Sequence, residues 1–456
     1  MRRSLVFVAG AVVVLSGACG SSGGGDRQVL VDYSPDEVAV FVAKDFPAKV
    51  AVKPGETIAF KQTWTGEPHT VTGGTNASAD IQRANKWSAL FDGYIGLAQN
   101  NHDMVNPEGP TDATFADFAA KLKAAKPASD AAKVVATWRS LRADYPQLPD
   151  IDNPPDVPFN DVNDLIDRLS EDHPALLDAT TDQTTVNQNA AQPCYLRTGS
   201  PPQDPEQPCT AAQQRQPAFD GTQSFYNSGV LPYEGQRGNT FKMKIAKTTK
   251  PGAYFFYCAV HGPDQQVEVD VVKPNAKIPS ASRETRVARA AAESVVAPLV
   301  KTFRDARADD KLTFEGEKLT GPFAGLPSEI HGGINEFVPR ALTVKAGEPV
   351  TWKVVGDHTI SFDVPAYLPI LQFTRRSVRY NPQVHDIVGG APTVPPQTGH
   401  GVQKFDAGTY SGKGFWSSGL MGADPYLEYT LRFAKPGTYP YACLVHPKMI
   451  GKVVVS

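Results

Sequence analysis

One loop near the end of the chain gathers three side chains that bind soft metal ions. Cys443, His446 and Met449 lie within seven residues, so a single loop can wrap all three around one ion. His358, in a distant segment, can supply a fourth donor. A thiolate and two imidazoles, completed by a weak thioether or amide, suit copper as it cycles between its two oxidation states. These residues therefore predict a copper site.

A similar set of donors occurs earlier in the chain. Cys258 and His261 repeat the Cys-x-x-His spacing, and His69 opens the tetrapeptide His-Thr-Val-Thr, which matches His-Thr-Ile-Ser at the later upstream histidine. A single Cys-x-x-His is common by chance and is also compatible with zinc. Its recurrence, each time with an upstream histidine, favours two metal sites of one kind.

The segments around these residues are repeated as well. Residues 46–57 match 338–349, and residues 225–231 match 415–421. Apolar residues alternate with polar ones in the first pair, and each run is broken by a glycine, which is typical of strand, turn and strand. Later in each half a Lys-Pro-Gly turn leads into an aromatic strand that ends at the cysteine. A repeat of this kind predicts two antiparallel β domains.

The stretch 441–455 and its counterpart resemble the cupredoxin family of blue copper proteins, and the second half is most similar to amicyanin and pseudoazurin. The resemblance covers about residues 30–75, 226–272, 335–362 and 410–456. It implies a mainly β chain of two Greek-key β-sandwiches, each with one type 1 copper. The ligands that it implies are His358, Cys443, His446 and Met449 in the second domain, and His69, Cys258 and His261 in the first.

The fourth ligand of the first site stays open at this point. After His261 the chain reads Gly-Pro-Asp-Gln-Gln, with no methionine. An amide serves as the axial ligand in stellacyanin-like sites, so Gln265 or Gln266 can take this place. We include Gln266 in the expected ligand set, although spacing does not choose between the two. Rival interpretations are ordinary buried side chains, structural zinc, and a first domain that has lost its metal.

The rest of the chain divides around these repeats. We expect the first β domain in residues 28–75 and 225–273, and the second in 334–456. Residues 76–224 form an insertion, in which 111–182 show helical spacing of apolar residues. Residues 274–333 connect the domains, with a helix over 281–309 and a kink at Pro298.

The N-terminus predicts export. Residues 1–18 have the layout of a signal peptide, and Cys19 with the Gly/Ser linker 19–27 resembles the lipid-bearing cysteine of a bacterial lipoprotein. No segment has the ~20 apolar residues that a spanning helix needs. We therefore expect a lipid-anchored protein on the outer face of the cell membrane, in the periplasm or cell-envelope space.

Composition and the remaining cysteines fit this location. Without Arg2 and Arg3 of the signal, 43 basic residues face 48 acidic ones with no basic run, so nucleic acid is not an expected partner. Cys194 and Cys209 bracket a proline-rich loop and have no other role, so an exported chain should pair them as a disulfide.

The motifs favour an electron carrier over an enzyme. The His-x-His and His-Cys-His motifs of multicopper oxidases do not occur, and Tyr257 and Ala442 stand where copper nitrite reductases have a histidine. A carrier needs only a metal of fixed geometry and an exposed ligand edge for its redox partner protein, which we expect in a membrane respiratory or periplasmic system. Copper storage or delivery is the alternative, and five methionines in the whole chain argue against it. A one-copper carrier with a metal-free first domain is the other alternative.

Overall fold

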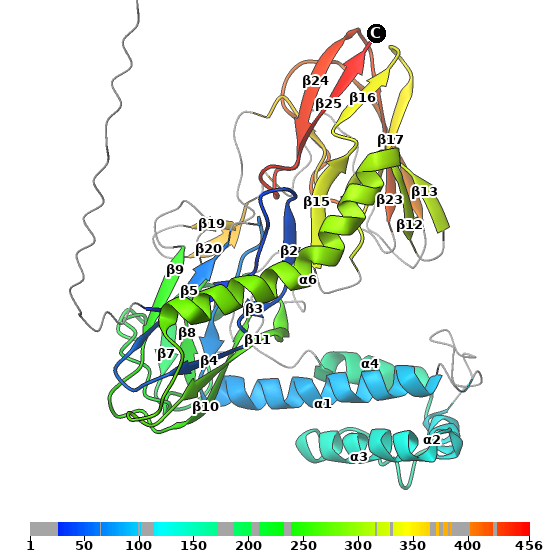
Figure 1. Ribbon diagram of the computed structural model, residues 1–456. Coiled ribbons are helices and arrows are strands. Elements are labelled where there is room, and N and C mark those ends of the chain that lie inside the picture. The colour runs from blue at the N-terminus through cyan, green and yellow to red at the C-terminus, as the bar shows by residue number, and fades with distance from the viewer. Residues whose placement is uncertain are drawn as a thin grey trace, which may run out of the picture.

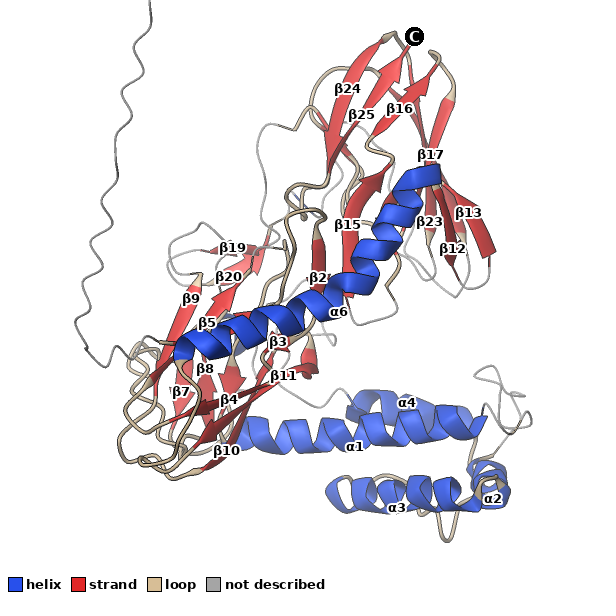
Figure 2. Ribbon diagram, viewed as in Figure 1, coloured by secondary structure: helices blue, strands red, loops and turns tan. Residues whose placement is uncertain are grey.

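The computed structural model shows two β-sandwiches side by side, with a helical unit projecting from the first of them (Figures 1 and 2). It describes residues 26–456 apart from 64, 99–100, 102–113, 171–185, 202–208, 232–238, 315–316, 329–331, 365–370, 374–376, 382–383, 385–401 and 423–425. The signal, Cys19 and most of the linker lie outside the described residues. No helix in the described part of the chain is long and apolar enough to cross a membrane.

The first sandwich is built from strands of both ends of the first half of the chain. Side chains from its two sheets, among them Phe60, Phe256 and Val269, share one buried apolar cluster. One sheet has the order β3-β1-β5-β9 and the other β4-β11-β10-β6-β8-β7. The strands are β1 Arg27–Val31, β3 Asp45–Phe46, β4 Lys49–Val52, β5 Thr57–Gln62, β6 Thr72–Gly73, β7 Cys194–Leu196, β8 Phe225–Asn227, β9 Thr240–Lys244, β10 Gly252–Cys258 and β11 Gly262–Val271.

The second sandwich repeats this strand order. Its sheets run β2-β15-β14-β17-β23-β21 and β16-β25-β24-β18-β22, and both contribute to one core around Trp352 and Tyr441. The mainly β fold class is therefore confirmed, and the sequence repeat is also a repeat of topology. The strands are β2 Val40–Val42, β14 Phe323–Leu326, β15 Gly332–Val338, β16 Ala341–Val344, β17 Pro349–Val354, β18 Ser361–Phe362, β21 Gln403–Tyr410, β22 Trp416–Ser417, β23 Leu427–Phe433, β24 Gly437–Ala442 and β25 Ile450–Val455.

The insertion is mainly helical and has a core of its own. Trp87, Phe115, Trp138 and Ile166 belong to one buried cluster that includes no strand residue. Its first helix also contacts strands β10 and β11, which joins the helical unit to the first sandwich. Cys194 and Cys209 form the expected disulfide next to Phe225. The helices are α1 Thr75–Ala98, α2 Phe115–Ala124, α3 Ala128–Asp144, α4 Phe159–Ser170 and α5 Gln188–Ala191.

A long helix, α6 (Ala281–Asp309), runs along both sandwiches (Figure 1). It contains Pro298 within one continuous helix. Ala292, Val296, Leu299 and Phe303 are buried along one face, where they pack in a cluster with residues of both halves of the chain, such as Val40 and Phe323. The connector is thus part of a core that the two domains share. The short hairpin of β12 (Lys311–Phe314) and β13 (Glu317–Thr320) follows it.

Each half of the chain also reaches onto the other. Strand β2, which we expected in the first domain, pairs with β15 and extends a sheet of the second. Its Val40 and Val42 are fully buried there, because alternate residues face the shared cluster. In return the hairpin of β19 (Leu371–Phe373) and β20 (Val378–Tyr380) packs against the first domain and α5. The exchange places the cysteine loops of the two domains at their common boundary.

Candidate metal centres

The second candidate site is formed where strand β24 ends. Cys443 follows this strand directly, and His358 lies just before β18, which pairs with β24. The Sγ atom of Cys443 lies 3.9 Å from Nδ1 of His358 and 3.6 Å from Nδ1 of His446, and the two Nδ1 atoms are 3.0 Å apart. Met449 is fully buried, and its carbonyl oxygen accepts a hydrogen bond from the Cys443 amide at 3.0 Å, which closes the ligand loop.

The first candidate site has the same construction. Sγ of Cys258, at the end of β10, lies 3.8 Å from Nδ1 of His69 and 3.6 Å from Nδ1 of His261. In the described part of the chain, these three residues and their counterparts are the groups of histidine, cysteine and carboxylate side chains that could hold a metal ion. Both predicted triads are thus brought together.

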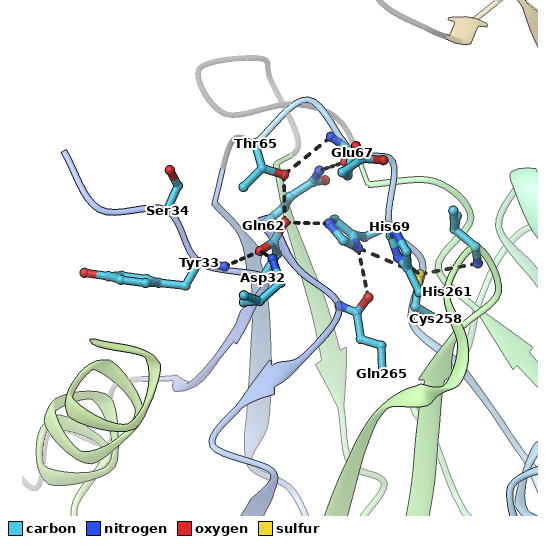
Figure 3. A network of polar contacts seen from close by, with 12 residues as sticks. Asp32, Tyr33, Ser34, Gln62, Thr65, Glu67, His69, Cys258, His261 and Gln265 are labelled. Carbon is cyan, nitrogen blue, oxygen red and sulfur yellow. Dashed lines mark hydrogen bonds and ion pairs between the residues drawn. The ribbon is translucent and has the colours of Figure 1, made fainter. Parts of the chain in front are cut away.

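The structure brings Gln265, and not Gln266, to the first site. Gln265 is fully buried, with Oε1 at 3.1 Å from Nδ1 of His69 (Figure 3). Its amide nitrogen donates to Asp45 at 3.1 Å. Gln266 is the next residue of a strand and therefore faces the other way, where it bonds Asn85. The glutamine beside the triad is thus Gln265, whereas Gln266, which we placed in the expected ligand set, lies on the other face of the strand.

Strand register explains this outcome. Gln266 pairs with the residue before Cys258, as Ile450 pairs with the residue before Cys443. Gln265 is therefore the counterpart of Met449. Three residues separate His261 from Gln265 and only two separate His446 from Met449, so spacing alone could not align them.

The threonine after each upstream histidine links the histidine segment to the cysteine loop by hydrogen bonds, a role that we did not predict from the sequence. The hydroxyl of Thr70 accepts a hydrogen bond from the Ala259 amide at 2.7 Å, and that of Thr359 accepts one from the Leu444 amide at 2.8 Å. The threonine amides in turn donate to the cysteine sulfur atoms, at 3.3 Å and 3.4 Å. The repeated His-Thr dipeptide is the signal that could have shown this.

The neighbouring histidines lower the pKa of both cysteine thiols. Burial raises the pKa of the Cys258 thiol, but hydrogen bonds from His261 and His69 outweigh it, so the pKa lies well below its ordinary value. Burial likewise raises the pKa of Cys443, and the positive charge of His446 with the hydrogen bond from His358 again lowers it well below the ordinary value. Thiolates are the form that binds metal ions.

Asp32 orients one ligand histidine of the first site. Its Oδ2 accepts hydrogen bonds from Nε2 of His69 at 3.1 Å and from the hydroxyl of Thr65 at 2.7 Å (Figure 3). Its Oδ1 accepts from the amides of Tyr33 and Val42. A proton fixed on Nε2 leaves the Nδ1 lone pair free for a metal, which is how an outer carboxylate tunes a ligand histidine.

The second site lacks this carboxylate. Leu30 pairs with Lys61 in the first domain, and Phe323 pairs with Lys353 at the matching place in the second. Two residues further along, Asp32 therefore corresponds to Gly325. Gly325 has a φ of +80°, and an added Cβ would lie 2.2 Å from Nε2 of His358. No larger side chain fits there without displacing the ligand.

His446 is oriented instead by a residue of the other domain. Its Nε2 donates to Oε1 of Glu67 at 2.9 Å. Burial raises the pKa of Glu67, but this hydrogen bond and the charges of the histidines lower it to about 2, so the carboxylate is ionised. The expected exposed ligand edge is therefore absent at His446, whose side chain is 2% exposed, whereas His261 is half-buried.

The residues present fit copper. Each triad offers one thiolate and two imidazole nitrogens within 4.8 Å of one another, in a buried setting. The sulfur-to-nitrogen distances of 3.6–3.9 Å suit ligands that share one ion at about 2.0–2.3 Å. Such a set with a buried amide or thioether nearby is the donor chemistry of a blue copper site.

Comparisons with known proteins find similar solved structures, but no match among family models or curated proteins. Among solved structures, a Cu(I) variant and an oxidised variant of amicyanin are each similar at 22% identity, covering 26% of this chain and 73% of that chain with a TM-score of 0.15. A reduced amicyanin variant is similar at 23% identity over the same shares, with a TM-score of 0.14.

Proposed function

We propose that this protein is an extracytoplasmic electron carrier that holds one type 1 copper in each β-sandwich. The observation that carries the proposal is the pair of triads, each with a cysteine Sγ that lies 3.6–3.9 Å from two histidine Nδ1 atoms. Copper in such a ligand set supplies one-electron transfer. A lipid on Cys19 holds the protein at the outer face of the membrane, where its partners are redox proteins.

The chain's own residues prepare this chemistry. Thr70 and Thr359 fix each upstream histidine beside its cysteine loop, and burial of the ligands other than His261 excludes water. Asp32 and Glu67 hold the Nε2 protons of His69 and His446, so that Nδ1 of each ring faces the thiolate. A geometry fixed in this way changes little between oxidation states, which is what rapid electron transfer requires.

Spectra with a copper count per chain test the proposal. We expect two coppers per chain, an intense blue absorption band, and loss of about half of the band in Cys258→Ser and in Cys443→Ser. Cys194→Ala with Cys209→Ala is the control, because these cysteines pair with each other and should leave the colour unchanged. A colourless protein that prefers zinc would contradict electron transfer. One copper, lost only in Cys443→Ser, would leave a one-copper carrier.

A further inference from the structure

We infer that the first domain completes the metal site of the second, with Glu67 as the positioning residue for His446. This inference rests on the proposed copper chemistry for its purpose, although the contact itself does not depend on it. Glu67 belongs to the first domain and precedes the ligand His69 by two residues. Its carboxylate nevertheless bonds the ligand histidine of the other domain, at 2.9 Å from Nε2 of His446.

The loop that carries Glu67 differs from its counterpart in a way that suits this role. Six residues, 63–68, separate the end of β5 from His69, whereas three residues, 355–357, separate the end of β17 from His358. The longer loop reaches across the boundary between the domains to His446.

Gly66 allows the loop to approach His446 closely. It has a φ of +101°, a conformation that favours glycine. A Cβ at this position would lie 2.7 Å from the Val445 carbonyl oxygen and 2.8 Å from Cδ2 of the His446 ring. The backbone of the first domain thus rests on the ligand loop of the second, and the absence of a side chain makes room for it.

A chain of hydrogen bonds holds the loop and links the two sites. His69 donates to Asp32, which also accepts from the hydroxyl of Thr65, and the Thr65 oxygen accepts from the Glu67 amide at 3.4 Å (Figure 3). Glu67 then accepts from His446. Gln62 adds a bond from its amide group to the Glu67 carbonyl oxygen at 2.7 Å. The carboxylate is therefore placed by the elements that build the first site.

The domains are also fixed to each other around this contact. Strand β2 pairs with β15, and the Ala39 amide next to it donates to the Glu336 carboxylate at 3.2 Å. Both domains share an apolar cluster along α6. Glu67 is thus a fixed part of the second site, and the edge of His446 is reached through the first domain and not from solvent.

The test uses the full chain in the Cys258→Ser background, in which only the second site binds copper with its complete ligand set. Competition with a Cu(I) chelator gives the affinity. Loss of an outer carboxylate typically weakens metal binding 10–100-fold, so we expect a weakening of this size in Glu67→Ala. Glu67→Gln keeps a hydrogen-bond acceptor and loses only the charge, so we expect a smaller weakening together with a higher reduction potential.

Glu37→Gln is the matched control. Glu37 lies just before β2 at the same boundary and pairs with Arg304, away from both sites. Equal affinity and potential in Glu67→Ala, Glu67→Gln and Glu37→Gln would overturn the inference and leave the proposed function intact. Copper binding that depends on Glu67 but gives no blue band or reversible couple would overturn the proposed function and support the inference.

A second measurement needs no metal. In the metal-free chain, the backbone amides of residues 443–449 should exchange hydrogen faster in Glu67→Ala than in Glu37→Gln, because the loop loses its contact with the first domain. Equal exchange in the two variants would count against the inference whatever the copper affinity.

Discussion

Matched positions of the two domains carry different residues beside otherwise equivalent ligands. Asp32 corresponds to Gly325, and Gln265 corresponds to Met449. Asp45 pairs with Val31 in the first domain, and Phe337 pairs with Ala324 at the matching place in the second. Asp45 therefore corresponds to Phe337, so the first domain has a carboxyl group where the second has an aromatic ring. A carboxylate and an amide oxygen favour oxidised copper, whereas a thioether favours reduced copper. If each site holds copper as proposed, we expect these differences to give the first site the lower potential.

Removing the Asp32 carboxylate should therefore weaken metal binding at the first site and change its reduction potential. In Asp32→Asn we expect 10–100-fold weaker metal binding and a higher reduction potential, because His69 loses the charge that raises its basicity. The measurement is a copper titration and a redox titration of the full chain in the Cys443→Ser background. Asp270→Asn, which changes an outward-facing carboxylate next to Lys49, should alter neither.

The axial position can be tested with two neighbouring glutamines. Gln265→Met places a thioether at the buried position that corresponds to Met449, so the potential of the first site should rise towards that of the second. Gln266→Met changes a side chain that bonds Asn85 and should leave the potential as it is. The reverse result would return Gln266 to the ligand set.

At the scale of strands and helices, sequence patterns predicted the strands, the groups of metal-binding side chains and the disulfide. Period-two runs and Pro-Gly turns gave the strands, recurring His and Cys residues gave both triads, and cysteine usage gave the disulfide. The patterns did not predict that β2 pairs with β15, because alternation shows which residues of a strand are buried and not which sheet buries them. They also did not predict Glu67 beside His446, because a lone glutamate in a loop carries no signal for a partner 379 residues away.

The disulfide belongs to this scale, because it anchors the end of the insertion beside β7 and β8. Cys194 and Cys209 are buried with Phe225 and close a short loop. Replacing both by alanine should lower the free energy of unfolding by about 2–4 kcal/mol, as for other disulfides that close loops of this kind. Chemical denaturation measures the loss, and mass spectrometry of an unreduced digest checks the pairing. Unchanged stability would mean that the bridge does not constrain the unfolded chain.

Over the whole molecule, the exchange of elements makes the two sandwiches depend on each other. Leu299 of α6 is buried in the cluster that both domains share. Leu299→Ala should cost about 2–5 kcal/mol, as for other buried leucines. Calorimetry should then show both domains shifting together, whereas Val287→Ala on the exposed face of the helix should have little effect. Two separate transitions, with only one of them moved, would contradict a shared core.

The relation between the two sites follows from the same arrangement. His446 is buried beneath the first domain, and His261 is half-buried, so the first site is the more accessible of the two for an outside partner. We expect Gln265 and Asp32 to lower its potential relative to the site with Met449. An electron accepted by the first site is therefore expected to pass on to the second, along the boundary where Glu67 lies.

Redox titration of the Cys258→Ser and Cys443→Ser chains gives the potential of each remaining site within the intact fold. Full chains are needed because β2 and the β19–β20 hairpin are exchanged, and isolated domains would lack them. We expect the lower potential in Cys443→Ser, and each tenfold preference of the electron for the second site corresponds to 59 mV for a one-electron couple. The chain with both cysteines should hold its first electron at the second site. Equal potentials would remove the relay, and a first site that binds no copper would leave an electron carrier with one working centre.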